Sequence, residues 1–252
     1  AAAVFCAAVI IAVSVFPNTG GSNIVFHGST ANVVRQSDER KNTLIIGVSS
    51  AIPDVHPYFH NNDAFYFFQR LVYEPLLSIG NNGSVNYLNA EKIVFENSGR
   101  QATVSLDKKK AFSNGEGVTA DIVLSSYHSF MKQDTAYNDL LDNIEYINKI
   151  DDYTLQFTFK LVRIFNINVF NIPVIYGTES DNAAWLGTGK YAVKSITPYG
   201  DSILIRNESA SEKGKYAEII LRHMDYSHID SLNEKQDFDI FMINHKNNKE
   251  ML

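Results

Sequence analysis

The order of apolar and polar residues predicts several strands in this chain. Residues 43–49 (TLIIGVS) form a nearly continuous apolar run, which is typical of a strand buried on both faces. Residues 153–160 (YTLQFTFK) instead carry apolar side chains at every second position, which indicates a half-buried antiparallel strand. Further strands are predicted over residues 189–197, 202–206, 218–224 and 238–243.

Apolar residues at helical spacing predict two longer helices and one short one. The first begins near Asp63 and ends near Pro75, which cannot continue a helix. The second has Thr119 as its N-cap and Asp121 in its first turn. A short helix is expected over residues 228–235. The residues expected to face the core are Phe67, Phe68, Leu71 and Val72 in the first helix, and Val123, Tyr127, Phe130 and Met131 in the second. Because strands and helices are mixed rather than strictly alternating, we expect a mixed α/β (α+β) fold.

The first 41 residues differ from the rest of the chain. Residues 1–16 are apolar except for Ser14, and a helix of this length would span about 24 Å, short of the ~30 Å hydrocarbon core of a bilayer. The run starts at Ala without a preceding basic region, so we interpret it as a truncated signal or anchor segment. Both a cleaved signal core and a retained anchor are compatible with it. Residues 17–41 are polar, contain three glycines, and are predicted to be a linker.

Composition limits the partners and the chemistry of the chain. A net charge of −6 with interspersed acidic and basic residues argues against nucleic acid as a partner. The single cysteine, Cys6, excludes an internal disulfide and a cysteine-based zinc cluster. Phe5 stands where a bacterial lipid-attachment site has a small residue, so an inert thiol is favoured over lipidation.

Candidate catalytic chemistry is sparse. The sequence contains no GxSxG, P-loop, GxGxxG or HExxH motif, and no carboxylate pair is placed for acid–base work. His56 and His60 are four residues apart, but Pro57 lies between them and no third metal ligand is apparent, so a polar loop is favoured. We therefore expect neither an enzyme nor a bound metal or cofactor.

Five segments, in this order along the chain, resemble one known family. They are residues 72–77 (VYEPLL), 110–123 (KAFSNGEGVTADIV), 151–155 (DDYTL), 187–191 (GTGKY) and 203–207 (ILIRN). The pattern is similar to the bacterial extracellular solute-binding proteins of family 5, the oligopeptide-, dipeptide- and nickel-binding type that serves ABC importers. Departures include Lys190 for the usual proline, Glu208 after Asn207, and His56 before Pro57.

The resemblance implies a periplasmic-binding-protein-like fold of type II, cluster C. Residues 42–55 and 178–245 would form the mixed sheet of the first lobe. Residues 56–177 would form an inserted subdomain, and the second lobe is expected to be missing from this chain.

The resemblance also implies a function and a ligand site. The protein would be the extracytoplasmic, membrane-tethered component that captures peptides or a related small solute for an ABC permease. A ligand sensor or surface binding protein of the same fold is the alternative.

The residues implied to contact ligand fall in three places. The loop after the first strand would pair with an extended ligand through its backbone. Tyr137 would contact the ligand or act as a surface or capping residue, and Trp185 would line the cleft or pack the hinge. Gly187 and Gly189 are expected to serve backbone conformation. The loop residues are Ser49, Ser50, Ala51 and Ile52.

Overall fold

The computed structural model describes residues 24–26, 29–31, 42–48, 50–52, 63–177, 186–224 and 238–242. The chain divides into two units, Ala1–Lys41 and Asn42–Leu252, which are described separately. Of the first unit, β1 (Ile24–Phe26) and β2 (Ser29–Ala31) form an antiparallel pair within the segment predicted as linker. The apolar run 1–16, the expected helix 228–235, and both Ser49 and Trp185 lie outside the described residues.

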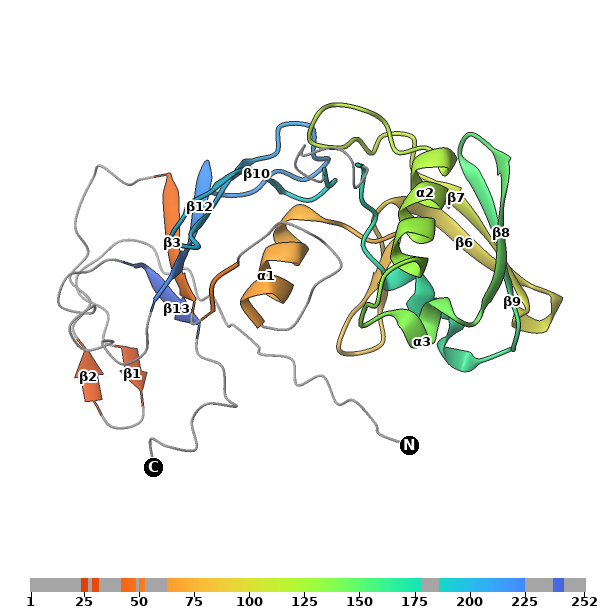
Figure 1. Ribbon diagram of the computed structural model, residues 1–252, viewed down its shortest axis with the longest axis horizontal. Helices are drawn as coiled ribbons and strands as arrows, with labels where there is room; N and C mark the ends of the chain where they lie inside the picture. The colour runs from red at the N-terminus through yellow and green to blue at the C-terminus, as the bar shows by residue number, and fades with distance from the viewer. Residues whose placement is uncertain are drawn as a thin grey trace. The chain divides into compact units, whose positions relative to one another are not determined.

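A five-stranded mixed sheet forms one part of the second unit (Figure 1). Its strand order is β10-β11-β12-β3-β13, in which β12, β3 and β13 are parallel while β10 and β11 are antiparallel to their neighbours. The strands are β3 (Thr43–Val48), β10 (Tyr191–Ile196), β11 (Ser202–Arg206), β12 (Glu218–His223) and β13 (Ile240–Met242). The predicted strands are therefore present, and their ends agree with the prediction or differ from it by one or two residues.

Strand β3 lies between two parallel neighbours, which explains its apolar composition. Ile45 and Ile46 point to opposite faces, yet they expose only 5% and 3% of their surface. Before β13 begins, Asp239 continues the pairing with β3: its Oδ2 accepts a hydrogen bond from the Ile45 amide at 2.8 Å. Its own amide donates to the Ile45 carbonyl at 2.8 Å. The prediction of a strand buried on both faces is confirmed.

Helix α1 (Asp63–Val72) packs beside β10 and ends three residues before Pro75. Phe68 and Val72 are fully buried, as predicted, and Phe65 is buried as well. Phe67 and Leu71 are half-buried against the same core. The early end of the helix frees Pro75 to pair with Pro173 in an isolated antiparallel bridge.

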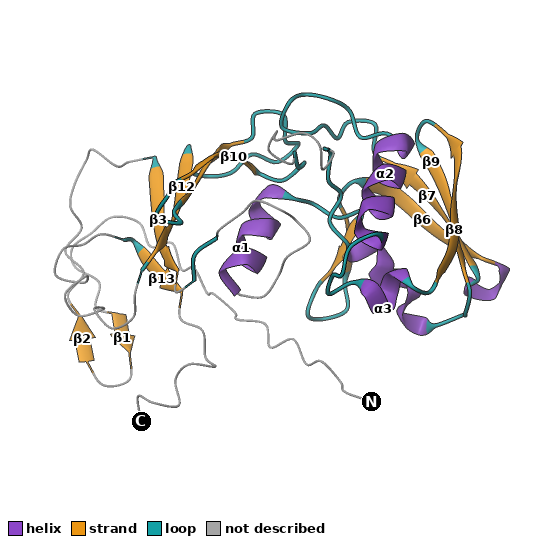
Figure 2. Ribbon diagram, viewed as in Figure 1, coloured by secondary structure: helices purple, strands orange, loops and turns teal. Residues whose placement is uncertain are grey.

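A four-stranded antiparallel sheet lies at the other end of this unit, with helices on one of its faces (Figure 2). Its order is β6-β7-β9-β8, formed by β6 (Ala90–Glu96), β7 (Gln101–Leu106), β8 (Ile144–Asp151) and β9 (Thr154–Phe159). Around it are the hairpin β4 (Leu77–Ile79) and β5 (Val85–Tyr87), the helices α2 (Ala120–Met131) and α3 (Asn138–Leu141), and the 3-10 helices η1 (Asn97–Gly99) and η2 (Ile164–Asn171).

An aromatic cluster joins this sheet to its helices. The Phe157 ring meets Tyr127 of α2 and Phe170 of η2 edge-on, at centroid distances of 5.1 and 5.0 Å. The buried Tyr127 hydroxyl donates a hydrogen bond to the Val169 carbonyl at 2.9 Å. Burial raises the pKa of Tyr127 above its ordinary value. The predicted alternation of β9 is confirmed, because its inward side chains are fully buried.

Two details of α2 differ from the prediction. Met131 was expected to face the core but exposes 39% of its surface, whereas the adjacent Phe130 in the same last turn is fully buried. Thr119 occupies the N-cap position, but its hydroxyl makes no capping hydrogen bond. Instead, the Ala120 amide donates to the Asp152 carbonyl at 2.8 Å, which joins the helix start to the turn between β8 and β9.

Candidate ligand site at the ends of the parallel strands

The parallel strands of the five-stranded sheet end at a common edge, where loops from distant parts of the chain meet. In open α/β sheets, ligands bind outside the carboxyl ends of the parallel strands. Here β3 ends at Val48 and β12 at His223, which are paired in register. The Met224 amide donates to the Val48 carbonyl at 3.0 Å, so the two chains stay together as they leave the sheet.

The loop after β3 begins at this edge, because it continues from the last residue of that strand. Ser50 and Ala51 are half-buried, so part of their surface faces solvent. Ile52 is fully buried within the main apolar core, so its side chain is unavailable to a ligand and serves to anchor the loop. An anchored loop of small residues leaves the backbone as the group that can pair with a ligand.

The turn between β10 and β11 lies at the same edge of the sheet, beside the loop after β3. Within it, the Thr197 amide donates to the Asp201 carbonyl at 2.8 Å, and the Gly200 amide donates to the Thr197 carbonyl at 3.0 Å. Gly200 has a φ of +87°, and a Cβ atom at this position would lie 2.8 Å from the Ala51 Cβ. Glycine is therefore required here both by conformation and by close contact with the loop after β3.

Polar groups attach this turn to the end of β12. Asp201 Oδ1 accepts a hydrogen bond from the His223 amide at 3.0 Å, and its Oδ2 lies 3.8 Å from the Arg222 Nε. The turn therefore holds Tyr199 in place at its tip, where that side chain exposes 85% of its surface. An aromatic ring on a fixed turn beside a binding edge can stack on a ligand.

Sequence reasoning missed the four residues Tyr199, Gly200, Asp201 and His223. The order Pro-Tyr-Gly-Asp between two predicted strands indicates a turn. Nothing in the sequence places that turn beside residue 51, because the two are some 150 positions apart and meet only through the pairing of β11, β12 and β3.

Tyr137 lies in a different part of the unit. It occupies the N-cap position of α3, and its ring packs edge-on against Phe130 of α2 at 5.6 Å. Burial raises the pKa of Tyr137 above its ordinary value, and the nearby phenol of Tyr66 on α1 raises it further. Tyr137 therefore packs in the core of the subdomain and also approaches the first turns of α1, where Tyr66 is 43% exposed.

The GTGKY segment joins the two sheets by close backbone contact. A Cβ on Gly187 would lie 1.9 Å from the Val72 carbonyl oxygen, and one on Gly189 would lie 2.4 Å from that of Leu71. The Gly189 amide donates to the Val72 carbonyl at 2.9 Å. Neither glycine has a positive φ, so the reason for glycine is close approach to α1 rather than the unusual backbone conformation expected from sequence.

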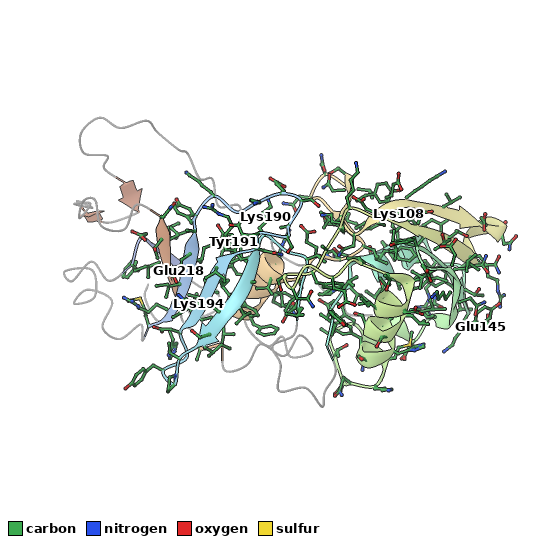
Figure 3. The ribbon with its side chains drawn as sticks, turned by 90° about the horizontal axis from the view of Figure 1, so that it is seen from above. Lys108, Glu145, Lys190, Tyr191, Lys194 and Glu218 are labelled. Atoms are coloured by element: carbon green, nitrogen blue, oxygen red, sulfur yellow. The ribbon has the colours of Figure 1, made fainter. Side chains whose placement is uncertain are left out.

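Asn207 and the start of β10 complete this junction. The Asn207 side chain, which is 2% exposed, donates from Nδ2 to the Gly189 carbonyl at 2.8 Å. The Tyr191 hydroxyl accepts from the Tyr216 amide at 3.1 Å, and Lys190 pairs with Glu212 at 2.9 Å (Figure 3). Lys190 thus replaces the usual proline without loss of the local fold, because its side chain extends outward to an acidic partner.

In the described ranges, no cluster of three or more His, Cys, Asp or Glu side chains is arranged to hold a metal ion. His56 and His60 lie outside those ranges. Every helix within them is too short or too polar to traverse a bilayer.

Residues 85–250 match the bacterial extracellular solute-binding proteins, family 5 (middle region), and the chain belongs to this family. Solved structures support the same fold. AgaA from A. tumefaciens R10, in complex with agropinic acid, matches 79% of this chain with a TM-score of 0.72 and 18% identity. The nickel ABC transporter protein from Bacillus halodurans matches 84% with a TM-score of 0.68 and 24% identity. AppA from Bacillus subtilis, in complex with a nonapeptide, matches 82% with a TM-score of 0.70 and 16% identity.

These matches cover only part of the related proteins. The chain spans 43% of AgaA and 45% of each of the other two. The fold is therefore a partial periplasmic-binding-protein fold of type II, as the resemblance implied.

Proposed function

We propose that this chain forms the first lobe of the extracytoplasmic substrate-binding component of an ABC importer. The ligand would be a peptide or a related small solute, which the complete protein delivers to a membrane permease. The observation that supports this best is the anchored loop of residues 50–52 at the carboxyl end of β3, in a chain of family 5.

The division of the chain follows from the same proposal. Residues 42–55 and 178–245 would be the mixed sheet of the lobe, and residues 56–177 the inserted subdomain. In the described parts of these ranges, the first holds the five-stranded sheet and the second the four-stranded sheet. Closure of a second lobe over the edge where the parallel strands of the five-stranded sheet end would bury the ligand between the two lobes.

The ligand would bind mainly through the protein backbone. An extended peptide can add its amides and carbonyls beside residues 49–52, as one more strand would. Tyr199 and Trp185 would supply aromatic surfaces around its side chains. This mode needs few charged contacts in the first lobe, which agrees with the uncharged residues Ser50, Ala51 and Ile52.

The test is a calorimetric titration of the complete gene product with peptides of two to nine residues, and with a nickel chelate. X-ray scattering of the same samples should show compaction when the ligand binds. Tyr199→Ala should weaken binding about tenfold by removing a stacking surface. Tyr146→Ala, on β8 and 46% exposed, is the matched control and should leave affinity unchanged. Absence of binding and of compaction with every ligand class would refute the proposal.

A further inference from the structure

One loop of the four-stranded-sheet region displays a run of apolar side chains to solvent. After β9, residues Leu161, Val162, Ile164 and Phe165 expose 55%, 57%, 90% and 67% of their surface. Single exposed apolar residues are common, but four within five consecutive positions are not expected on a surface without a binding role. We call residues 160–165, which run from the end of β9 into the first two residues of η2, the apolar loop.

The apolar loop is held in a fixed conformation by two buried asparagines. Asn143 and Asn166 expose only 6% and 4% of their surface. Asn143 accepts from the Leu161 amide at 3.1 Å and donates to the Leu161 carbonyl at 3.0 Å. Asn166 donates to the same carbonyl at 3.1 Å, and the two asparagines are joined at 2.8 Å.

This arrangement shows that the exposure does not come from a loose loop. Burying two amide side chains is unfavourable unless their hydrogen bonds are made, and here the two side chains form these bonds with the loop backbone and with each other. Val162 also rests against Gly99, where a Cβ atom would meet its Cγ1 at 3.4 Å. The apolar side chains are thus presented on a rigid base, which lowers the entropy lost on docking.

The apolar loop itself carries two basic residues, Lys160 and Arg163. Lys160 donates from Nζ to the Asp142 carbonyl at 2.7 Å, and among the described residues no carboxylate forms an ion pair with it. In the described part of the chain, no carboxylate lies within ion-pair distance of Arg163. Arg100, whose carbonyl accepts from the Phe159 amide, is neutralised by Glu145 at 3.3 Å (Figure 3). Within the described part of the chain, Lys160 and Arg163 are therefore two cations without an acidic partner beside the exposed apolar side chains, although the chain as a whole has a net charge of −6.

We propose that the apolar loop docks this protein onto a membrane surface that carries anionic headgroups. Ile164 and Phe165 would enter the boundary between headgroups and acyl chains, while Lys160 and Arg163 would contact headgroup phosphates. Apolar side chains next to Lys and Arg are the pattern of segments that bind the interface without spanning it. The two cations favour a membrane over a second copy of the chain. Although the chain is acidic overall, a dimer formed through this loop would have to bury Lys160 and Arg163 in its interface.

The docking is independent of ligand capture. It would act through the four-stranded-sheet region, whereas the candidate ligand site lies at the edge of the five-stranded sheet. Failure of either proposal leaves the other intact.

The first test follows the loop itself, so that membrane binding by any other segment does not affect it. An environment-sensitive fluorophore is attached at Phe165→Cys in the full chain carrying Cys6→Ser. Vesicles of phosphatidylglycerol and phosphatidylcholine should shift its emission to the blue and allow quenching by a lipid-borne quencher. The same fluorophore at Tyr199→Cys, also highly exposed, should show neither change. A fluorophore at residue 165 that stays in water overturns the proposal.

The second test separates apolar from electrostatic contributions by vesicle co-sedimentation. Ile164→Ser with Phe165→Ser should weaken loop-dependent binding about tenfold or more, since two apolar side chains no longer enter the bilayer. Arg163→Gln should weaken binding about fivefold on anionic vesicles and leave binding to pure phosphatidylcholine unchanged. Both variants should keep the wild-type melting temperature. Unchanged sedimentation of both variants overturns the proposal, as does conversion of a solution dimer to monomer by the serine pair.

Discussion

The two sheets of residues 42–242 bury their strands in different ways. In the five-stranded sheet, β3 has parallel neighbours on both sides and aliphatic side chains on both faces. In the four-stranded sheet, every pairing is antiparallel, and β9 buries Phe157 on one face while Gln156 stays half-exposed on the other. Parallel strands bring their carboxyl ends to one edge, so a site can form there from backbone and loops. An antiparallel sheet with one packed face instead offers surfaces and loop tips for contacts.

The largest expected effect tests the aromatic core of the four-stranded sheet. Phe157→Ala should lower the free energy of unfolding by about 4 kcal/mol, because it removes a fully buried ring that contacts two others. Phe165→Ala, in the apolar loop, should change it by less than about 0.5 kcal/mol. Denaturant titration measures both. Equal losses for the two variants would show that the aromatic cluster does not form the core.

The next effect tests the junction between the two sheets. Gly187→Ala places a Cβ against the Val72 carbonyl and should cost about 3 kcal/mol by overpacking. Gly117→Ala is the matched control, because a Cβ there meets no atom within 4 Å. Thermal unfolding followed by near-UV circular dichroism should show a lower transition temperature for the first variant only. A wild-type transition for Gly187→Ala would mean that the junction is looser than described.

A smaller effect is expected from the ion pair between Lys110 and Glu74. Their charged atoms lie 2.8 Å apart, and the side chains are only 12% and 15% exposed. Lys110→Met should destabilise the fold by about 2 kcal/mol, because it leaves Glu74 largely buried without a counter-charge. Arg100→Met breaks a pair that is 54% and 43% exposed, and should cost under about 1 kcal/mol. The reverse order of the two losses, by denaturant titration, would contradict the burial of the first pair.

The smallest effect concerns the Tyr127 hydroxyl. Tyr127→Phe should cost about 1 kcal/mol, because the Val169 carbonyl loses its buried donor. Burial raises the pKa of Tyr127 in the folded state above its ordinary value of 10.0, so its contribution is complete below that pH. It is lost as the pH rises further, since only the unfolded chain then ionises. The stability of Tyr127→Phe should therefore fall less steeply than that of the wild type above pH 10, and parallel curves would count against this assignment.

Much of the fold could be predicted from local sequence. The run TLIIGVS and the alternation YTLQFTFK each report how many faces of a strand are buried, which is a local property. The burial of the last turn of α2 was harder to predict. Met131 continues the apolar spacing of Tyr127, yet it is exposed while the adjacent Phe130 is buried, so the spacing alone does not set burial at the end of the helix. Part of the candidate site could be predicted in the same way, because residues 50–52 directly follow a predicted strand. The position of the turn at Tyr199 depends on the order of the strands in the sheet, which local sequence does not give.

Local patterns of residues were enough to predict the strands of the five-stranded sheet and the helices α1 and α2, and five ordered motifs were enough to indicate family 5. Those properties depend on neighbours a few positions apart. Three contacts follow from the three-dimensional packing alone: Gly200 with Ala51, Gly187 with the end of α1, and the two asparagines with the apolar loop. Each of these contacts joins segments brought together by the pairing of strands, the packing of helices on sheets, or the folding of loops over them. Such arrangements are set by the packing of the whole unit, and no local pattern of residues encodes them.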